Sequence, residues 1–263
     1  MSKPSLLLIP GSFCPPELYD QVVDPVIARG YEIRALHLPS VGLAADKGRE
    51  GSLPTMYDDA AFIAQEAEKL ADQGKAVVLI AHSYGGVPTT QSVKGLAASE
   101  RKKQGKPGGI VRLAYMTSLV PAVGVSAAGV LAEVPQEQKL DLKIDETGWM
   151  YHDQPSATAA ITVNHLTPAE GEAVIRRFAR HSSVSFGGEL TYPGYKDVPV
   201  SYLLCEDDLC IPPNIQKAEI DMIEKESGNK VRVTRIPADH CPNITSTQET
   251  IDWIVDVAEQ AQA

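Results

Sequence analysis

Ser83 stands in a sequence context that can turn a serine hydroxyl into a nucleophile. The run from Ile80 to Gly86 reads IAHSYGG; it follows the apolar stretch 76–80 and precedes a stretch that fits a helix. A nucleophile elbow requires this order of strand, tight turn and helix, because the serine backbone is strained and small neighbours leave room for the reversal. Ala81 replaces the first glycine of the usual G-x-S-x-G pattern and adds only a methyl group. The spacing predicts that Ser83 attacks a carbonyl carbon.

A serine nucleophile needs a base, and histidine suits proton transfer near neutral pH. His240 is the predicted base because it follows a strand-like run and precedes the last helix. His82 is next to Ser83, but adjacent strand residues point to opposite faces, so we expect it to face away and to pack in the core. The other four histidines are expected at surface or packing positions, although the last three could line a pocket: His37, His152, His165 and His181.

A carboxylate must hold the histidine in the correct tautomer. The strand-like run 202–205 is followed by three acidic residues, Glu206, Asp207 and Asp208. Three acidic residues at one strand end repel one another, so their presence there favours a functional role for one of them. A solvated acidic turn is the alternative explanation. We choose Asp208 as the acid, with Asp207 as the alternative.

The segment after the first predicted strand, Pro10 to Cys14, reads PGSFC. In a fold with this kind of elbow, the corresponding loop supplies one backbone N–H of the oxyanion hole, and the residue after the nucleophile supplies the other. We therefore predict the Ser12 and Tyr84 amides as donors, with Phe13 and Cys14 as pocket walls. A simple turn before Pro15 and Pro16 is the alternative reading of this segment.

The order Ser83, Asp208, His240, together with the segment 202–212 (YLLCEDDLCIP), resembles the α/β-hydrolase superfamily, and more narrowly its branch of methylesterases and hydroxynitrile lyases. The resemblance implies an α/β-hydrolase fold, with a mostly parallel central sheet, helices on both faces and a small helical cap. It also implies that the lyases carry a lysine directly after the base and a threonine in the first loop. Cys241 and Gly11 occupy these positions here, which favours the esterase side.

The elements that must position these residues alternate along the chain, as in a parallel sheet covered on both faces. A helix is predicted over 55–73, with Thr55 and Asp58 as its cap signal, and a last helix with Ser246 and Glu249 in capping-box spacing. The apolar stripe of the last helix is predicted as Ile251, Ile254, Val255 and Ala258. The predicted strands are 5–10, 32–38, 76–82, 111–117, 201–205 and 230–236.

Two segments break this alternation. The stretch 99–109 is rich in lysine, arginine and glycine and is expected to be a solvated loop. The stretch 121–193 has a helix signal over 168–180 and no clear strand pattern, so we predict that it forms a cap over a core made of 1–120 and 194–263. Trp149, Met150 and Tyr151 either line the pocket or pack inside the cap, and the sequence leaves both readings open.

The composition narrows the class of partner. The formal net charge of −10 makes nucleic acid a poor partner, and a small molecule fits better. The four cysteines form no zinc pattern, and the apolar run at the start of the chain is too short for a signal peptide or membrane span. We expect a cytoplasmic monomer or homodimer that uses no metal and no cofactor.

These observations predict a serine hydrolase that cleaves a small, hydrophobic carboxylic ester or lactone through an acyl-enzyme on Ser83. Two alternatives remain open. The first is a lyase, of the hydroxynitrile-lyase or carbon–carbon cleaving type, that uses the same three residues. The second is a ligand-binding receptor built on the hydrolase fold.

Overall fold

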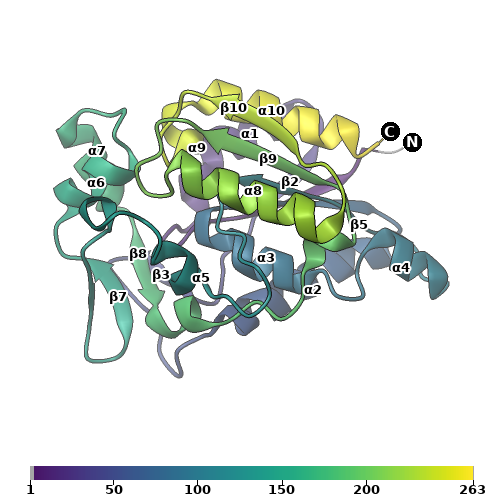
Figure 1. The fold of residues 1–263 in the computed structure, drawn as a ribbon, viewed down its shortest axis with the longest axis horizontal. Coiled ribbons are helices and arrows are strands. Elements are labelled where there is room, and N and C mark those ends of the chain that lie inside the picture. Colours follow the sequence, from purple (N-terminus) through teal and green to yellow (C-terminus); the bar gives the residue numbers. More distant parts are fainter. Residues whose placement is uncertain (1–2, 263) are drawn as a thin grey trace.

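Six segments of the chain form one sheet in which every neighbouring pair of strands is parallel (Figure 1). The computed structural model describes residues 3–262, apart from the side chain of Glu137. The six predicted strands are confirmed, with ends shifted by a few residues. They are β1 (Ser5–Ile9), β2 (Glu32–Ala35), β4 (Ala76–His82), β5 (Gly109–Met116), β9 (Val200–Cys205) and β10 (Arg232–Ile236), in the spatial order β10-β9-β5-β4-β1-β2.

Strand alternation divides the core into two layers, one on each face of this sheet. In β1, Leu7 and Ile9 belong to one apolar cluster, whereas Leu6 and Leu8 belong to the other. Each fully buried side chain of this size contributes about 1.5–3 kcal/mol. The first cluster packs against α2 (Met56–Asp72), α3 (Gly86–Ser92) and α8 (Pro213–Ser227), and the second against α1 (Asp20–Ala28) and α10 (Thr247–Gln260).

The two predicted helix caps have different outcomes. At α2 the capping box is present, because the Asp58 amide donates to Thr55 Oγ1 at 3.3 Å and the Thr55 amide donates to Asp58 Oδ2 at 2.7 Å. At α10 the predicted capping box is wrong. The short helix α9 (Pro242–Thr245) runs directly into α10, so the Ser246 amide donates to the Pro242 carbonyl and the Ser246 side chain makes no capping bond.

The predicted stripe of α10 also needs one correction. Ile251, Ile254 and Ala258 are buried as expected, but Val255 is only half-buried, and Trp253 and Val257 complete the buried face.

The basic segment 99–109 is more ordered than its composition indicates. Helix α4 (Ala98–Lys103) occupies its first half, and the Arg101 guanidinium is fully buried. Arg101 donates to Asp72 at 2.6 Å and to the carbonyl of Pro107 at 3.0 Å. The expectation of a solvated loop is therefore wrong for Arg101, which ties the turn to α2.

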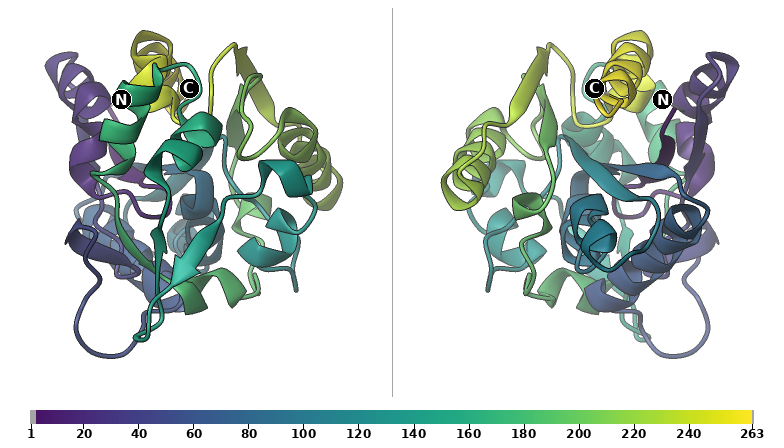
Figure 2. Two further views of the ribbon diagram at one scale, coloured as in Figure 1. Left: turned by 90° about the vertical axis from the view of Figure 1, so that its left-hand side faces the viewer. Right: turned by 90° about the vertical axis from the view of Figure 1, so that its right-hand side faces the viewer.

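The cap is not only helical. It holds helices α5 (Ala127–Leu131), α6 (Pro155–Thr162) and α7 (Pro168–Ile175), and α7 ends five residues before the predicted boundary. It also holds strands β6 (Leu142–Ile144), β7 (Trp149–His152) and β8 (Ala179–Ser182). These strands join β3 (Val41–Ala45) in an antiparallel cap sheet of order β3-β8-β7-β6, which faces the viewer in the left panel of Figure 2. Strands of three to five residues give too little alternation to be detected in the sequence.

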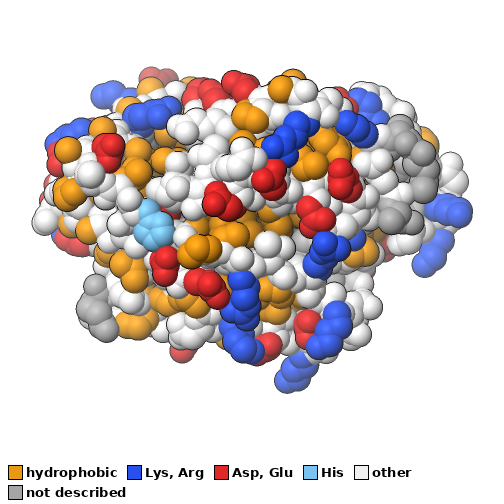
Figure 3. All heavy atoms as spheres, turned by 90° about the horizontal axis from the view of Figure 1, so that it is seen from above, with side chains coloured by type: hydrophobic (Ala, Val, Ile, Leu, Met, Phe, Trp, Pro, Cys, Tyr) orange, Lys and Arg blue, Asp and Glu red, His pale blue; other side chains and the backbone are white. Residues whose placement is uncertain are grey.

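The remaining regular segments are 3₁₀ turns, and they include the turn that carries Ser83. They are η1 (Pro16–Tyr19), η2 (Ser83–Gly85), η3 (Gln136–Gln138), η4 (Ser183–Gly187) and η5 (Gly194–Lys196). Over residues 3–262 we find no helix long and apolar enough to cross a membrane. The face that carries α10, seen from above in Figure 3, mixes acidic, basic and apolar side chains without an extended basic patch.

Candidate active site

The candidate site lies at the carboxyl edge of the parallel sheet, where ligands bind in open α/β folds. Every strand except the edge strand β2 sends one group of the site from its carboxyl end. Ser12 follows β1, Ser83 follows β4, Thr117 follows β5, Asp208 follows β9 and His240 follows β10. Residues far apart in the sequence therefore meet along one edge.

Ser83 lies at the tip of a strained turn between β4 and α3, as the elbow pattern predicts. Its φ is +53°, in the left-handed region that residues with a side chain seldom adopt. Gly85 and Gly86, which follow Ser83, allow this turn to pack closely against the segments that follow β1 and β5. A Cβ atom on Gly85 would lie 2.6 Å from the carbonyl oxygen of Pro10, and one on Gly86 would lie 2.4 Å from that of Leu119. Larger residues at these two positions would push the elbow away from β1 and β5.

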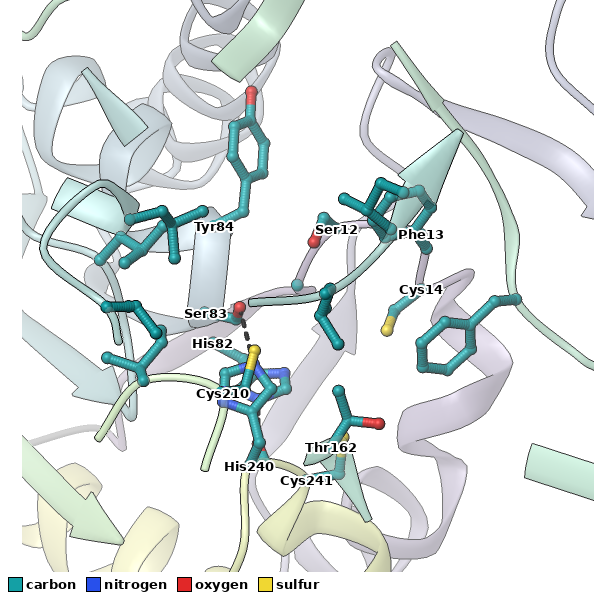
Figure 4. A pocket seen from close by; sticks show the side chains of 18 of the residues that line it. Ser12, Phe13, Cys14, His82, Ser83, Tyr84, Thr162, Cys210, His240 and Cys241 are labelled. Carbon is teal, nitrogen blue, oxygen red and sulfur yellow. Dashed lines mark hydrogen bonds between the residues drawn. The ribbon is translucent and has the colours of Figure 1, made fainter. Parts of the chain in front are cut away.

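His240 bridges Ser83 and Asp208, and Figure 4 shows the Ser83 side of this bridge. Its Nε2 lies 2.9 Å from Ser83 Oγ, and its Nδ1 lies 2.8 Å from Asp208 Oδ2. The exposed fractions of Ser83, His240 and Asp208 are 7%, 5% and 1%, so water is largely excluded from these hydrogen bonds. This is the spatial order that a nucleophile, a base and an orienting acid require.

The structure separates the two candidate acids. Asp208 accepts hydrogen bonds from the amides of Cys210 and Ile211 at 2.7 and 2.8 Å, and from the Thr117 hydroxyl. Asp207 is half-exposed and pairs with His165 Nε2 at 3.2 Å. Asp208, and not Asp207, is therefore the carboxylate in contact with His240.

The charge of Asp208 sets the protonation of His240. Burial of the ring by itself lowers the pKa of His240, but the Asp208 carboxylate and contact with Cys210 raise this pKa well above its usual value near 6.5. The neutral ring that can accept a proton from Ser83 therefore predominates only on the alkaline side of this raised pKa.

His82 has a larger role than the packing role expected of it. It points to the α1 side of the sheet, where it is buried, and burial lowers its pKa to about 3. Its Nε2 donates to the His240 carbonyl at 2.7 Å, and its Nδ1 accepts from the Tyr19 hydroxyl at 2.6 Å. Tyr19 in turn accepts from the Gly11 amide at 2.9 Å. His82 thus ties the base loop to the loop after β1, a link that its position beside Ser83 alone could not show.

The loop after β1 leaves one amide for a ligand. The Gly11, Phe13 and Cys14 amides donate to Tyr19, His181 and the Gly11 carbonyl, respectively. Among the described hydrogen bonds of this loop, none uses the Ser12 amide. Tyr84 lies in the first turn after Ser83, where backbone amides lack helical partners. Its ring points away from Ser83 in Figure 4, so only its backbone faces the site.

An apolar cavity of about 190 Å³ opens over Ser83 and His240. Phe13 and Cys14 line it, as expected, and so do Cys210 and Cys241. The sequence did not single out the rest of its apolar wall, which belongs mainly to the cap: Leu119, Leu131, Val134, Leu140, Leu142, Phe178, Phe186 and Ile211.

Trp149 and Tyr151 lie outside the lining of this cavity. Trp149 is buried against Gly48, whose added Cβ would come within 2.5 Å of the indole ring. Tyr151 lies under the Arg180 guanidinium, 4.9 Å from the ring centre. Met150 packs in the core beneath the cap sheet. Adjacent residues of β7 face opposite ways, and His152 at its end is the one that reaches the cavity.

In residues 3–262, no group of three or more histidine, cysteine, aspartate or glutamate side chains is arranged to hold a metal ion. The polar residues at the cavity floor are instead paired with one another, as described above. What the arrangement offers chemically is a hydroxyl, a base and backbone N–H donors beside an apolar space.

Comparisons with known proteins identify the family of the chain and its fold. The sequence model of the alpha/beta hydrolase family matches residues 6–253. A protein described as a "probable hydrolase" from Phoma sp. is 32% identical over 258 residues, which cover 98% of this chain and 99% of that protein. Methylesterase 9 of Arabidopsis thaliana is 25% identical over 246 residues, covering 88% of this chain and 89% of that protein.

A solved structure shares the fold. The crystal structure of a pyrethroid hydrolase from Sphingobium faniae superposes with a TM-score of 0.75 at 23% identity and covers 98% of each chain. The resemblance inferred from Ser83, Asp208 and His240 is confirmed by these matches, including its methylesterase side. The chain therefore belongs to the alpha/beta hydrolase family.

Proposed function

We propose that this protein hydrolyses small, apolar carboxylic esters or lactones through an acyl-enzyme on Ser83. The observation that carries the proposal is the bridge made by His240, which lies within hydrogen-bond distance of both Ser83 and Asp208 at the floor of an apolar cavity. A family member with this arrangement has a nucleophile, a base and an acid in the order that acyl transfer needs.

In the first half-reaction, His240 Nε2 takes the proton of Ser83 Oγ as that oxygen bonds to the ester carbonyl carbon. The carbonyl oxygen becomes an oxyanion, which the Ser12 and Tyr84 amides stabilise. His240 then gives its proton to the leaving alkoxide, which departs as an alcohol and leaves the acyl group on Ser83. Removing one oxyanion donor from a site of this kind costs about 100- to 1,000-fold in rate.

In the second half-reaction, His240 takes a proton from water as the water oxygen attacks the acyl carbon. The new oxyanion collapses, Ser83 recovers its proton from His240, and the carboxylic acid leaves. Asp208 orients the His240 ring and stabilises the positive charge that His240 carries between the two proton transfers.

The cavity supports an apolar substrate. Leucine and phenylalanine side chains make up most of its apolar wall, and Lys139 is the one lysine or arginine among the lining residues. Burying an alkyl or aryl group against them contributes about 25 cal/mol per Å² of apolar surface. The names of the relatives, a methylesterase and a pyrethroid hydrolase, point to substrates that are cleaved by hydrolysis.

The position after the base favours hydrolysis over cyanohydrin cleavage. Cys241 stands where the resemblance implies a lysine in the lyases; it is buried, and burial raises the pKa of its thiol well above the usual value. A neutral thiol cannot supply the positive charge that would stabilise a cyanide leaving group.

The test combines trapping with turnover. A fluorophosphonate probe should label the wild type at Ser83, as mapped by mass spectrometry, and should not label Ser83→Ala. p-Nitrophenyl esters of increasing acyl length should be hydrolysed by the wild type, and turnover should fall by about 10⁵- to 10⁶-fold in Ser83→Ala. Full turnover by a correctly folded Ser83→Ala protein would overturn the proposal, and so would labelling at another residue.

A further inference from the structure

His181, on strand β8 of the cap sheet, is fully buried behind the loop that follows β1. Its Nδ1 accepts a hydrogen bond from the Phe13 amide at 3.3 Å. Two residues earlier in β8, the Ala179 amide donates to the Phe13 carbonyl at 2.8 Å. Strand β8 therefore binds both backbone groups of Phe13, the residue next to Ser12.

These two bonds act on a strained residue. The φ angle of Phe13 is +65°, a conformation that a residue with a bulky side chain rarely adopts without support. Such strain persists only where the surroundings over-determine the backbone. The loop is also close to the elbow, because a Cβ on Gly11 would lie 3.1 Å from Ser83 Cβ.

The hydrogen bonds assign one tautomer to His181. Since the Phe13 amide can only donate, Nδ1 must be unprotonated and the proton must sit on Nε2. Nε2 lies 2.9 Å from Ser185 Oγ, and the Ser185 hydroxyl donates to the Ser182 carbonyl at 2.9 Å. Nε2–H is therefore the donor to Ser185. Burial lowers the pKa of His181 to about 3, so the ring stays neutral and Nδ1 remains an acceptor.

The second oxyanion segment is held in the same region. The Tyr84 ring contacts the His181 ring edge-on, with centroids 4.8 Å apart. Its hydroxyl donates to Asp59 Oδ2 at 2.8 Å, and the same buried carboxyl group accepts from the Ser40 amide at 2.9 Å. His181 thus contacts both Phe13, which follows one expected oxyanion donor, and the side chain of Tyr84, whose amide is the other.

We propose that His181 is a positioning residue for the oxyanion hole, which it shapes from the cap through the backbone of Phe13. By engaging the Phe13 amide, it holds the loop 11–14 in the strained form that leaves the Ser12 amide as the donor beside Ser83. The inference rests on the proposed acyl-enzyme mechanism. His181 touches neither the ester nor Ser83 in this role.

Two substitutions separate positioning from packing. His181→Leu removes the acceptor for the Phe13 amide, and His181→Asn keeps an acceptor, because Asn Oδ1 takes the place of His Nδ1. With a p-nitrophenyl ester, His181→Leu should lower kcat about 10- to 100-fold, while KM changes by less than about threefold, since the lost interaction matters mainly for the oxyanion. His181→Asn should retain kcat within about threefold of the wild type.

A trifluoromethyl ketone supplies a second readout, because it adds to a serine hydroxyl to give a stable tetrahedral oxyanion. Its inhibition constant should rise in His181→Leu by the same factor by which kcat falls. Val257→Ala removes buried methyl groups between α10 and the sheet, outside the cavity lining, and serves as the control for lost stability. It should lower the Tm without changing kcat at a temperature well below the Tm.

If His181→Leu does not fold, Ser185→Ala carries the test, because it removes the acceptor that fixes the His181 tautomer. It should lower kcat by about threefold or more with KM unchanged. An unchanged kcat in the folded His181→Leu or Ser185→Ala protein, or equal losses in His181→Leu and His181→Asn, would overturn the positioning role. Failure of the mechanism itself would appear separately, as full turnover by Ser83→Ala.

Discussion

Two walls of one cavity hold their side chains in different ways. At the carboxyl edge of the parallel sheet, Ser83, His240 and Asp208 are joined by hydrogen bonds, and Asp208 has three further donors. Across the cavity, the cap presents residues such as Leu131, Val134 and Leu142, which pack without directional contacts. We infer that the sheet edge supplies the reacting groups, whereas the apolar wall of the cap determines which acyl group fits.

Substitution of the base, His240, should have the largest effect and tests the catalytic role of the sheet edge most directly. His240→Ala removes the proton acceptor for Ser83 and should lower kcat/KM by about 10⁶-fold, as loss of either the serine or the histidine does in hydrolases with this kind of triad. The measurement is hydrolysis of a short-chain p-nitrophenyl ester, with circular dichroism as the check on folding. A folded variant that kept a tenth of wild-type activity would show that His240 is not the base, and it would contradict the catalytic role proposed for the sheet edge.

The acid should have the next largest effect. Asp208→Asn should lower kcat about 10⁴-fold because the amide no longer holds the correct tautomer of His240. Asp207→Asn, at the half-exposed neighbour, is the matched control and should change kcat by less than about threefold. The reverse ranking in steady-state assays would move the acid to Asp207.

The Asp208→Asn substitution should also change the pH dependence of kcat/KM. In the wild type, the pKa of His240 is raised well above 6.5, so kcat/KM should fall as the pH drops through that raised value. Asp208→Asn removes the main charge that raises the pKa of His240, and it leaves burial, which lowers this pKa, together with the smaller raising effect of Cys210. The acid limb of the residual activity should therefore move to lower pH, and a limb that stays in place would show that another group controls it.

In the apolar wall of the cap, a single substitution should alter the selectivity among esters more than the rate of hydrolysis. Leu142→Ala enlarges the apolar wall and should shift the ratio of kcat/KM values for long-chain and short-chain esters about tenfold toward the long chain. The activity with the shortest ester should stay within about threefold of the wild type. Equal loss with every chain length would show that the cap wall also sets the rate.

The smallest effect is expected at a helix cap that does not line the cavity. Thr55→Ala removes the cap of α2 and should lower the free energy of unfolding by about 1 kcal/mol, as measured by urea denaturation. Since Thr55 lies outside the cavity lining, kcat/KM should not change below the unfolding transition. A loss of activity in the folded variant would mean that α2 transmits strain to the elbow, which carries Tyr84 and its bond to Asp59.

The same two regions explain what the sequence could predict. The strands before Ser83 and Asp208 are runs of buried residues, so local patterns were enough to place these two side chains. The strand before His240 is mostly exposed, and His240 was placed by its position between this strand and the last helix. The choice between Asp207 and Asp208 required coordinates, because a shift of one residue turns the side chain to the other side. His82 required them as well, since its partners Tyr19 and His240 are far away in the sequence.

The cap resisted prediction for a physical reason. Its strands are short, and β8 gains its partner from Val41–Ala45, more than 130 residues earlier in the chain. Pairing of this kind depends on tertiary contacts, which override local propensity. For the same reason, the sequence left open whether Trp149 and Tyr151 line the pocket or pack inside the cap, and their neighbours, Gly48 and Arg180, became visible only in the fold.

The pairing of β3 with β8 has a consequence for engineering and for divergence among relatives. Because β3 lies outside 121–193, that segment does not contain the whole cap sheet. If residues 121–193 alone were grafted into a relative, β8 would have to pair with the β3 strand of that relative. A chimera that exchanges substrate preference between two such proteins should carry Val41–Ala45 along with the cap. Among relatives, substitutions in β3 should therefore be accompanied by compensating substitutions in β8.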